Sequence, residues 1–216
     1  MSDFTYEFST PKSSLETYEW DNLWWEKAND TENKDRVLII GDSISCSYRK
    51  MVNEILDGRI YADGLGTSKA LDNPAFLALF DYFMAQCPDC KAIQFNNGLH
   101  GWHMSNESYF EHYAETIRYI KNKYPDKKLI IALTTPARRK DNIELFGERN
   151  EIVLARNMLA TEIAKREGIV VNDFYSIVCD NPEYFFPDGI HIKPEACMLL
   201  ARQCADTFCK VLDVKL

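Results

Sequence analysis

Short apolar runs alternate with longer segments of helical periodicity along most of the chain, and this alternation restricts the possible folds more than any other feature. The runs that predict strands are residues 36–40, 59–62, 92–95, 128–134 and 169–173. The segments that predict helices are residues 48–56, 73–85, 108–123, 149–167 and 194–212. Repeated strand–helix units favour parallel strand pairing, with helices on both faces of one sheet. The strand runs are apolar throughout, which is typical of parallel strands buried on two sides.

We therefore predict an α/β fold, a three-layer α/β/α domain with a five-stranded parallel sheet over residues 35–216. A chain of 216 residues is long enough for one such domain with a sizeable core. Residues 1–34 differ from the rest because they are polar and rich in aromatic residues, among them Tyr18, Trp20, Trp24 and Trp25. Large aromatic side chains need to be covered, so we expect this leader to pack across the domain. A platform for a sugar ring or a protein partner is the alternative.

Charge and hydropathy exclude several classes of function. The formal net charge is −8 at pH 7, whereas a protein that binds nucleic-acid backbones needs a basic surface. No apolar run approaches the roughly 18 residues that span a bilayer, and the N-terminus lacks a basic start followed by an apolar stretch. We therefore expect a cytoplasmic protein with no nucleic-acid or membrane partner, although a signal removed earlier would leave no trace. The oligomeric state is not indicated.

The cysteine pattern argues against disulfides, metals and cofactors. The chain has seven cysteines, an odd number in a chain that is not small, so a disulfide framework is not expected. Cys87 and Cys90 form a CxxC motif, but the motif precedes a strand-like run, whereas redox motifs of this kind begin a helix after a strand. No second CxxC completes a zinc site. We expect reduced, structural cysteines.

Polar residues are concentrated where the predicted strands end. GDSIS (41–45) follows the first strand, DGLGTSK (63–69) the second and NNGLHGWH (96–103) the third. Parallel sheets bind ligands beyond the carboxyl ends of their strands, so we expect these segments to converge on one site. Ser43 is suited to act there as a nucleophile, and an ordinary helix cap is the alternative.

A serine nucleophile needs a general base, a group that orients the base, and hydrogen-bond donors for the oxyanion. DGIH (188–191), just before the last predicted helix, offers the first two. A turn through glycine can bring the carboxylate of Asp188 near the imidazole of His191. The carboxylate then holds the tautomer that leaves the other ring nitrogen free to accept a proton. A D-x-x-H motif alone is weak, and two unrelated loop residues are the alternative.

The two segments together resemble the SGNH (GDSL) hydrolase superfamily, in which a GDS motif follows the first strand and a DxxH motif precedes the last helix. The resemblance covers the chain from about residue 34 to the end. It implies a flavodoxin-like α/β/α fold and a carboxylic ester hydrolase. It also implies that Ser43 is the nucleophile, His191 the base and Asp188 its orienting group. The second block of the family implies that Gly66 donates to the oxyanion, with Gly64 as the alternative.

The third block of this chain departs from the family pattern. The family has GxND, whose asparagine donates to the oxyanion, whereas this chain has NNGLHG (96–101), in a form that resembles a subgroup with FNNGLHG. If the glycines align, His100 replaces the asparagine, and a neutral imidazole N–H can serve as a donor. If the asparagines align, Asn97 or Asn96 is the donor. Asn97 and His100 are therefore joint candidates.

The resemblance implies a serine esterase for a small acyl group, and we expect acetyl esters of a small molecule or an oligosaccharide. Trp102 and Thr135 are candidate substrate contacts, although a core aromatic and a strand terminator explain them equally well. The basic run 138–140 suits an acidic sugar or is simply solvated. One alternative function is a non-catalytic module that binds an anion or a glycan on the same fold. Another is a metal hydrolase that uses His100 and His103.

Overall fold

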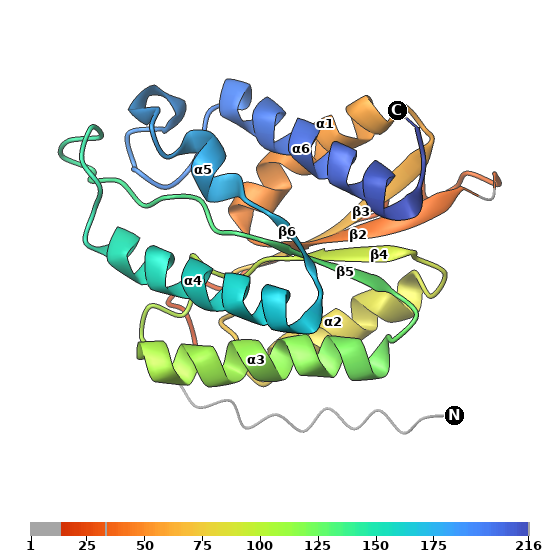
Figure 1. Cartoon of the computed structure of the whole chain (residues 1–216), viewed down its shortest axis with the longest axis horizontal. Helices are drawn as coiled ribbons and strands as arrows, with labels where there is room; N and C mark the ends of the chain where they lie inside the picture. The colour runs from red at the N-terminus through yellow and green to blue at the C-terminus, as the bar shows by residue number, and fades with distance from the viewer. Residues whose placement is uncertain (1–13, 33, 216) are drawn as a thin grey trace.

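One six-stranded sheet runs through the molecule (Figure 1). The computed structural model describes residues 14–32 and 34–215, so the first 13 residues of the predicted leader lie outside the described part. The strands are β1 (Asp21–Trp24), β2 (Asp35–Gly41), β3 (Ile60–Thr67), β4 (Ala92–Phe95), β5 (Lys128–Ala132) and β6 (Val170–Asn172). Their order is β1-β3-β2-β4-β5-β6, and only β1 runs antiparallel to its neighbour. The five predicted parallel strands are present, and the sequence analysis did not predict the sixth.

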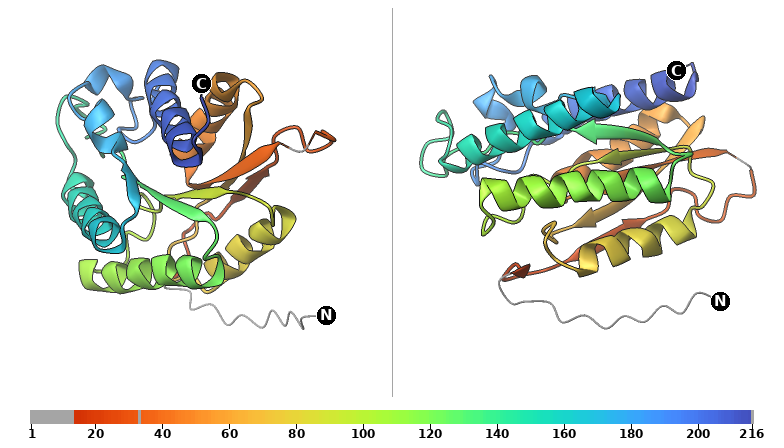
Figure 2. Two further views of the ribbon diagram at one scale, coloured as in Figure 1. Left: turned by 45° about the vertical axis from the view of Figure 1, so that its right-hand side comes forward. Right: turned by 60° about the horizontal axis from the view of Figure 1, so that its bottom comes forward.

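Helices cover both faces of the sheet, which confirms the predicted three layers. They are α1 (Ser43–Leu56), α2 (Ala75–Gln86), α3 (Asn106–Lys123), α4 (Arg149–Glu167), α5 (Phe174–Val178) and α6 (Pro194–Leu212), with a 3-10 turn, η2, at Pro182–Tyr184. α1, α5 and α6 lie on one face, and α2, α3 and α4 on the other (Figures 1 and 2). Side chains alternate along β2, so Val37 and Ile39 join one core while Leu38 and Ile40 join the other.

The leader contributes the edge strand of the sheet. β1 pairs with β3 from Asp21 opposite Thr67 to Trp24 opposite Gly64. The second predicted strand ends at residue 62, before Gly64 and Gly66, and glycine has low strand propensity. β3 instead continues to Thr67, since its backbone is paired on both sides, with β1 and with β2. Tertiary pairing overrides local propensity here.

Two glycines of β3 let α1 pack closely against the sheet. A Cβ on Gly64 would lie 2.8 Å from Cδ of Arg49, and a Cβ on Gly66 would clash with Sγ of Cys46. Both of these side chains belong to α1. Because Ser43 is the first residue of the same helix, this close packing fixes the position of the serine above the sheet.

The helices differ from the predicted ones mainly at α1, α5 and η2, while α2 and α3 differ from their predicted bounds by one or two residues. α1 begins at Ser43, five residues before the predicted start, because the carboxylate of Asp42 accepts a hydrogen bond from the Ile44 N–H at 2.9 Å and caps the helix. Ile44 is the only large apolar residue among residues 43–47, so hydrophobic periodicity did not reveal this first turn. α5 and η2 were not predicted. β4, α4 and α6 have the predicted bounds.

A buried ion pair ties the leader to the domain. Asp63 is fully buried, and both of its carboxylate oxygens accept from Nη1 of Arg36, at 2.7 and 2.9 Å. The carboxylate also accepts from the Glu26 N–H and from the thiol of Cys87 in the CxxC motif. All seven cysteines are free thiols. Within residues 14–32 and 34–215, no helix has the length and apolar character needed to cross a bilayer.

We predict that Arg36→Met lowers the free energy of unfolding by about 3 kcal/mol at pH 7, because the buried carboxylate of Asp63 loses its cation. Burial raises the pKa of Asp63, although the Arg36 guanidinium and the Glu26 N–H oppose this. A raised pKa means that the folded state binds the proton more tightly than the unfolded chain. This group therefore stabilises the fold at low pH, and the contribution is lost as the pH rises through the folded pKa.

Removal of Arg36 raises the pKa of Asp63 further, so at about pH 4.5 the carboxyl group of the variant takes up a proton more readily. The difference in unfolding free energy between wild type and Arg36→Met should therefore be smaller at about pH 4.5 than at pH 7. Urea unfolding at the two pH values measures it. Arg166→Met is the control, because the Arg166 side chain is 67% exposed in its pair with Glu167, and its loss should cost less than about 1 kcal/mol. A deficit that does not change with pH would contradict the prediction.

Candidate active site

Ser43 lies at the point where the connections of the sheet diverge. β2 pairs with β3 on one side and with β4 on the other, so the carboxyl end of β2 is a switch point of the kind where α/β sheets bind ligands. Ser43 follows this end of β2 and is half-buried. Ser45 is buried, and its hydroxyl donates to the carbonyl of Asp42 at 2.6 Å. Ser43 is thus the serine of GDSIS (41–45) that the site can use.

The DGIH loop (188–191) brings an imidazole to this serine. Nε2 of His191 lies 2.9 Å from Oγ of Ser43, although 148 residues separate them in the chain. Nδ1 of the same ring lies 2.8 Å from Oδ2 of Asp188. The other carboxylate oxygen accepts the backbone N–H groups of Ile190 and His191, both at 2.8 Å. The structure therefore joins the three predicted residues in one chain of hydrogen bonds.

The charges along the hydrogen bonds from Ser43 through His191 to Asp188 suit proton transfer. Desolvation raises the pKa of Asp188, but hydrogen bonds from the Ile190 N–H and from the His191 side chain and backbone outweigh it and lower the pKa overall. An ionised Asp188 accepts the Nδ1–H of a neutral His191, and this leaves Nε2 as the acceptor for the Ser43 proton. The arrangement can therefore move a proton from Ser43 to His191.

The glycine of DGIH is required by the backbone. Gly189 has φ +75°, a left-handed conformation that favours glycine. A Cβ on Gly189 would also clash with the carbonyl of Arg138, whose N–H donates to the Gly189 carbonyl at 2.7 Å. A bridge between Phe185 and Ile192 closes the loop at its base. These contacts fix the loop that carries Asp188 and His191.

Gly66 lies beside the turn that carries the serine. It is opposite Gly41 of β2 on one side and Asn22 of β1 on the other. A Cβ on Gly66 would lie 3.5 Å from the carbonyl oxygen of Asp42 and 3.3 Å from the Trp20 ring. Gly66 is therefore adjacent to the start of α1, where the resemblance places an oxyanion donor.

The two asparagines after β4 differ in how their amides are used. The amide nitrogen of Asn96 donates to the Ala132 carbonyl at 2.7 Å and to Oγ1 of Thr134 at 3.0 Å. Both of its N–H groups are therefore committed to structure. The amide nitrogen of Asn97 donates only to the Lys69 carbonyl, at 2.9 Å, and has a second N–H. This difference favours Asn97 over Asn96 as a donor to a ligand.

His100 is held by the leader. Nδ1 of His100 lies 3.6 Å from Oε1 of Glu16, and the ring meets the Trp20 ring edge-on at 6.4 Å. The same oxygen of Glu16 accepts the Gly101 N–H at 2.9 Å. Nε2 of His100 has no hydrogen-bond partner within residues 14–32 and 34–215. Asn97 and His100 thus both remain candidate donors, and sequence reasoning missed Glu16 because the leader lies outside the motifs.

Sequence reasoning also missed Arg156 of α4, which organises the loop after β4. Its side chain is almost fully buried and donates to the carbonyls of Gly98, His100 and Gly101, at 3.0, 2.6 and 2.8 Å. The guanidinium also lies 4.0 Å from the centre of the Tyr109 ring. The only sequence signal was an arginine inside a predicted helix, and nothing local indicates partners 55 to 58 residues away.

The two predicted substrate contacts lie in different environments. The guanidinium groups of Arg149 and Arg156 lie over the Trp102 ring, at 4.8 and 5.0 Å from its centre. Thr135 is 2% exposed, and its hydroxyl has no partner among the described residues. This burial favours the interpretation of Thr135 as a strand-end residue. Trp102 is half-buried at the edge of the core.

The described residues offer no donor set for the metal-hydrolase alternative. Nε2 of His103 lies 2.9 Å from a carboxylate oxygen of Asp72, whereas His100 faces Glu16. Within residues 14–32 and 34–215, no three His, Cys, Asp or Glu side chains are grouped as ligands of a metal ion. The two histidines therefore serve separate contacts.

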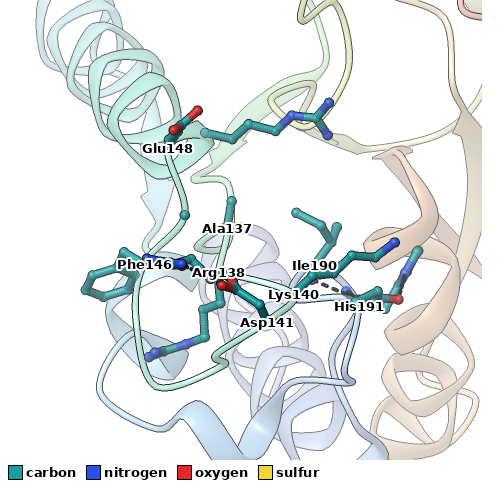
Figure 3. Close-up of a pocket in the computed structure, with 12 residues that line it drawn as sticks. Ala137, Arg138, Lys140, Asp141, Phe146, Glu148, Ile190 and His191 are labelled. Carbon is teal, nitrogen blue, oxygen red and sulfur yellow. Dashed lines mark hydrogen bonds and ion pairs between the residues drawn. The ribbon is translucent and has the colours of Figure 1, made fainter.

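A cavity of about 720 Å³ adjoins the DGIH loop, a size typical of small-molecule sites. Figure 3 shows Lys140, Ile190 and His191 together on one side of it, with Phe146 and Glu148 on the opposite side. The lining residues are Ala137, Arg138, Arg139, Lys140, Asp141, Phe146, Gly147, Glu148, Arg149, Asp188, Ile190 and His191. The cavity is therefore rich in charged groups, and it includes His191, the hydrogen-bond partner of Ser43, in its lining.

No protein-family model and no curated protein matches the sequence, but solved structures share the fold. A GDSL-like lipase from Bacteroides thetaiotaomicron superposes with a TM-score of 0.65 at 17% identity, covering 82% of this chain and 89% of that chain. The acetylxylan esterase Axe2 from Geobacillus stearothermophilus gives 0.62 at 13% identity, covering 84% and 95%. A putative arylesterase from Agrobacterium tumefaciens gives 0.62 at 18% identity, covering 84% and 100%. The chain thus has the α/β/α fold of GDSL-like hydrolases, as the resemblance implied.

We predict that Arg156→Met lowers the free energy of unfolding by about 2–4 kcal/mol, because buried carbonyls of the loop after β4 lose their donor. Arg156→Lys should recover only part of the loss, since an ammonium lacks the planar fork that reaches several acceptors. Denaturant unfolding measures both. Arg202→Met, at an exposed position of α6, is the control and should change stability by less than about 0.5 kcal/mol. Equal stability of the Arg156→Met and Arg202→Met variants would refute the role of Arg156.

Proposed function

We propose that this protein is a serine esterase that hydrolyses small acyl esters, with Ser43 as nucleophile, His191 as base and Asp188 as its orienting group. One observation supports this most directly, the chain of hydrogen bonds from Ser43 through His191 to Asp188. A serine that only capped a helix would need no imidazole at its hydroxyl. The fold is shared with structures described as GDSL-like lipases, an acylhydrolase and acetyl xylan esterases.

The geometry supports a two-step acyl transfer. Nε2 of His191 takes the proton of Ser43 as Oγ attacks the ester carbonyl carbon, and negative charge develops on the carbonyl oxygen. The carbon–oxygen bond to the alcohol then breaks, and His191 gives its proton to the leaving alcohol. A water molecule repeats the sequence on the acyl-serine, releases the carboxylic acid and restores Ser43.

Donors for the oxyanion come from three segments. The N–H of Ser43 belongs to the first turn of α1, where N–H groups lack helical partners. The resemblance implies a second donor at Gly66 of the neighbouring strand, whose backbone is paired with β1 and β2, and Asn97 or His100 offers a third donor from a side chain. Loss of one such donor typically lowers turnover by about 10²–10³-fold.

The substrate that we propose is an acetyl ester of a carbohydrate. Two structures that share the fold are acetyl xylan esterases, and the cavity beside His191 is lined by charged side chains, which suit a polar alcohol better than a long acyl chain.

The mechanism needs side chains and water alone, so we propose that no cofactor takes part. We further propose that the protein acts in the cytoplasm.

The alternative of a non-catalytic anion-binding module is less well supported. Such a module would use free N–H groups at the start of α1. The carboxylate of Asp42 already accepts the Ile44 N–H there, and such a module would leave the hydrogen bonds from Ser43 through His191 to Asp188 without a role. The esterase therefore fits the site better.

We predict that Ser43→Ala and His191→Ala each lower kcat for short-chain para-nitrophenyl esters by at least about 10³-fold, because each removes a partner of the proton transfer. A fluorophosphonate should label the wild type and leave Ser43→Ala unlabelled. Ser47→Ala is the matched control, since Ser47 lies one turn further along α1, where its hydroxyl donates to the Ile44 carbonyl and accepts from the thiol of Cys197. Equal rates in wild type and Ser43→Ala would reject the nucleophile, and tight anion binding without labelling would favour the binding module.

We predict that removal of the third-block donor lowers kcat by about 10²–10³-fold with little change in KM, because the bond forms mainly in the transition state. Steady-state kinetics of Asn97→Ala and His100→Ala then identify which residue is the donor. Asn96→Ala is the contrast, since its amide is bonded to Ala132 and Thr134, and its loss should appear in thermal unfolding. If neither Asn97→Ala nor His100→Ala reduces kcat, this block supplies no oxyanion donor.

A further inference from the structure

A basic hairpin, residues 138–146, borders the cavity beside His191, with Lys140 on the side of His191 and Phe146 on the opposite side. A bridge pairs Arg138 with Phe146, and the Arg139 N–H donates to the Leu145 carbonyl at 3.0 Å. The Arg138 guanidinium lies 4.8 Å from the centre of the Phe146 ring and donates to backbone carbonyls. The Arg138 N–H also binds the Gly189 carbonyl of the DGIH loop. The hairpin is therefore held at a fixed position relative to the proposed catalytic base.

The cavity is lined by four basic and three acidic side chains, the acidic ones being Asp141, Glu148 and Asp188, which leaves a small positive excess in a protein whose net charge is −8. Its basic lining residues are Arg138, Arg139, Lys140 and Arg149. Arg139 is neutralised by Asp141 at 2.5 Å. Lys140 and Arg149 are exposed, and neither forms an ion pair with any carboxylate of the described residues. Glu148 lies on the opposite side of the cavity from Lys140 and His191 (Figure 3).

The cavity lies where the alcohol portion of an ester has to be. In the proposed reaction, His191 gives its proton to the leaving alcohol, so the alcohol must lie on the His191 side of Ser43. Asp188, Ile190 and His191 all line the cavity. The unpaired cations of the basic hairpin and of α4 therefore face the alcohol portion of a bound substrate.

We infer that this alcohol portion carries an anionic group, the carboxylate of an acidic sugar, and that Lys140 and Arg149 bind it. The inference rests on the proposed esterase function and names its substrate class. A charged acceptor makes stronger hydrogen bonds to lysine and arginine than a neutral one, and a cationic cleft raises the local concentration of an anionic substrate. Sulfate and phosphate esters are also anionic, the phosphate with a charge of about −1.5 to −2 at pH 7, so the test includes them.

The test compares two acetate esters of similar size, 4-acetoxybenzoate and its neutral methyl ester. The ratio of kcat/KM for the charged and the neutral ester is measured in wild type, Lys140→Ala and Arg149→Ala. Differences in leaving-group chemistry cancel, because the same pair of esters is used for every variant. We expect the ratio to fall about three- to tenfold in each variant. Lys140→Arg should retain the ratio, and Lys140→Glu should lower it further.

Lys165→Ala is the charge-matched control. It removes the same charge from the far end of α4, about 24 Å along the helix from Arg149, and should leave both rates unchanged. Added salt should lower the ratio in wild type but not in Lys140→Ala/Arg149→Ala, because salt screens the attraction.

Two outcomes separate this inference from the proposed function. An unchanged ratio in both Lys140→Ala and Arg149→Ala, while hydrolysis still depends on Ser43, overturns the anionic substrate alone. Hydrolysis that does not depend on Ser43 overturns the esterase mechanism itself. 4-Acetoxyphenyl phosphate and sulfate form the remaining arms. A larger effect of Lys140 and Arg149 on these esters than on the carboxylate would overturn the acidic sugar.

Discussion

The loops that follow β4 and β5 are buried beneath the site, and their peptide groups must find partners within the protein. Three polar side chains of α4 supply them. Asn157 accepts the Thr134 N–H at 2.8 Å and donates to the Thr134 carbonyl at 2.9 Å. Asn150 accepts the Ala137 N–H at 3.1 Å, and Arg156 binds three carbonyls of the loop after β4. The geometry of the site therefore depends on the docking of one helix.

This constraint explains what the sequence could and could not predict. The bounds of α4 were predictable, since Gly168 ends the helix in a left-handed conformation at φ +67°. The inward-facing polar residues of α4 were not, because their partners lie in other loops. β1 was not predictable either, because it forms a strand only by pairing with β3. The meeting of Ser43 and His191 was predicted from the family resemblance that the GDSIS and DGIH motifs carry together, and neither motif alone indicates it.

The leader is part of the site as well as of the sheet. Glu16 binds the Gly101 N–H and faces His100, and the Ser68 hydroxyl accepts the N–H of Trp20 at 2.9 Å. These contacts fix two of the segments from which oxyanion donors are proposed. The composition of the leader predicted only that it packs across the domain. Its pairing with β3 and its contact with the loop after β4 were not predictable, because neither leaves a pattern in the local sequence.

The proposed catalytic chain is open to solvent, and this bears on the role of the cavity. The side chains of His191 and Asp188 are 49% and 40% exposed, and charge interactions in contact with water are weak because the dielectric constant is high. The imidazolium of the proposed acyl transfer is therefore stabilised fully only when the substrate covers it. In the proposed mechanism, the alcohol portion between the basic hairpin and His191 excludes this water. Its binding energy then acts in the transition state, so the cavity contributes to rate as well as to specificity.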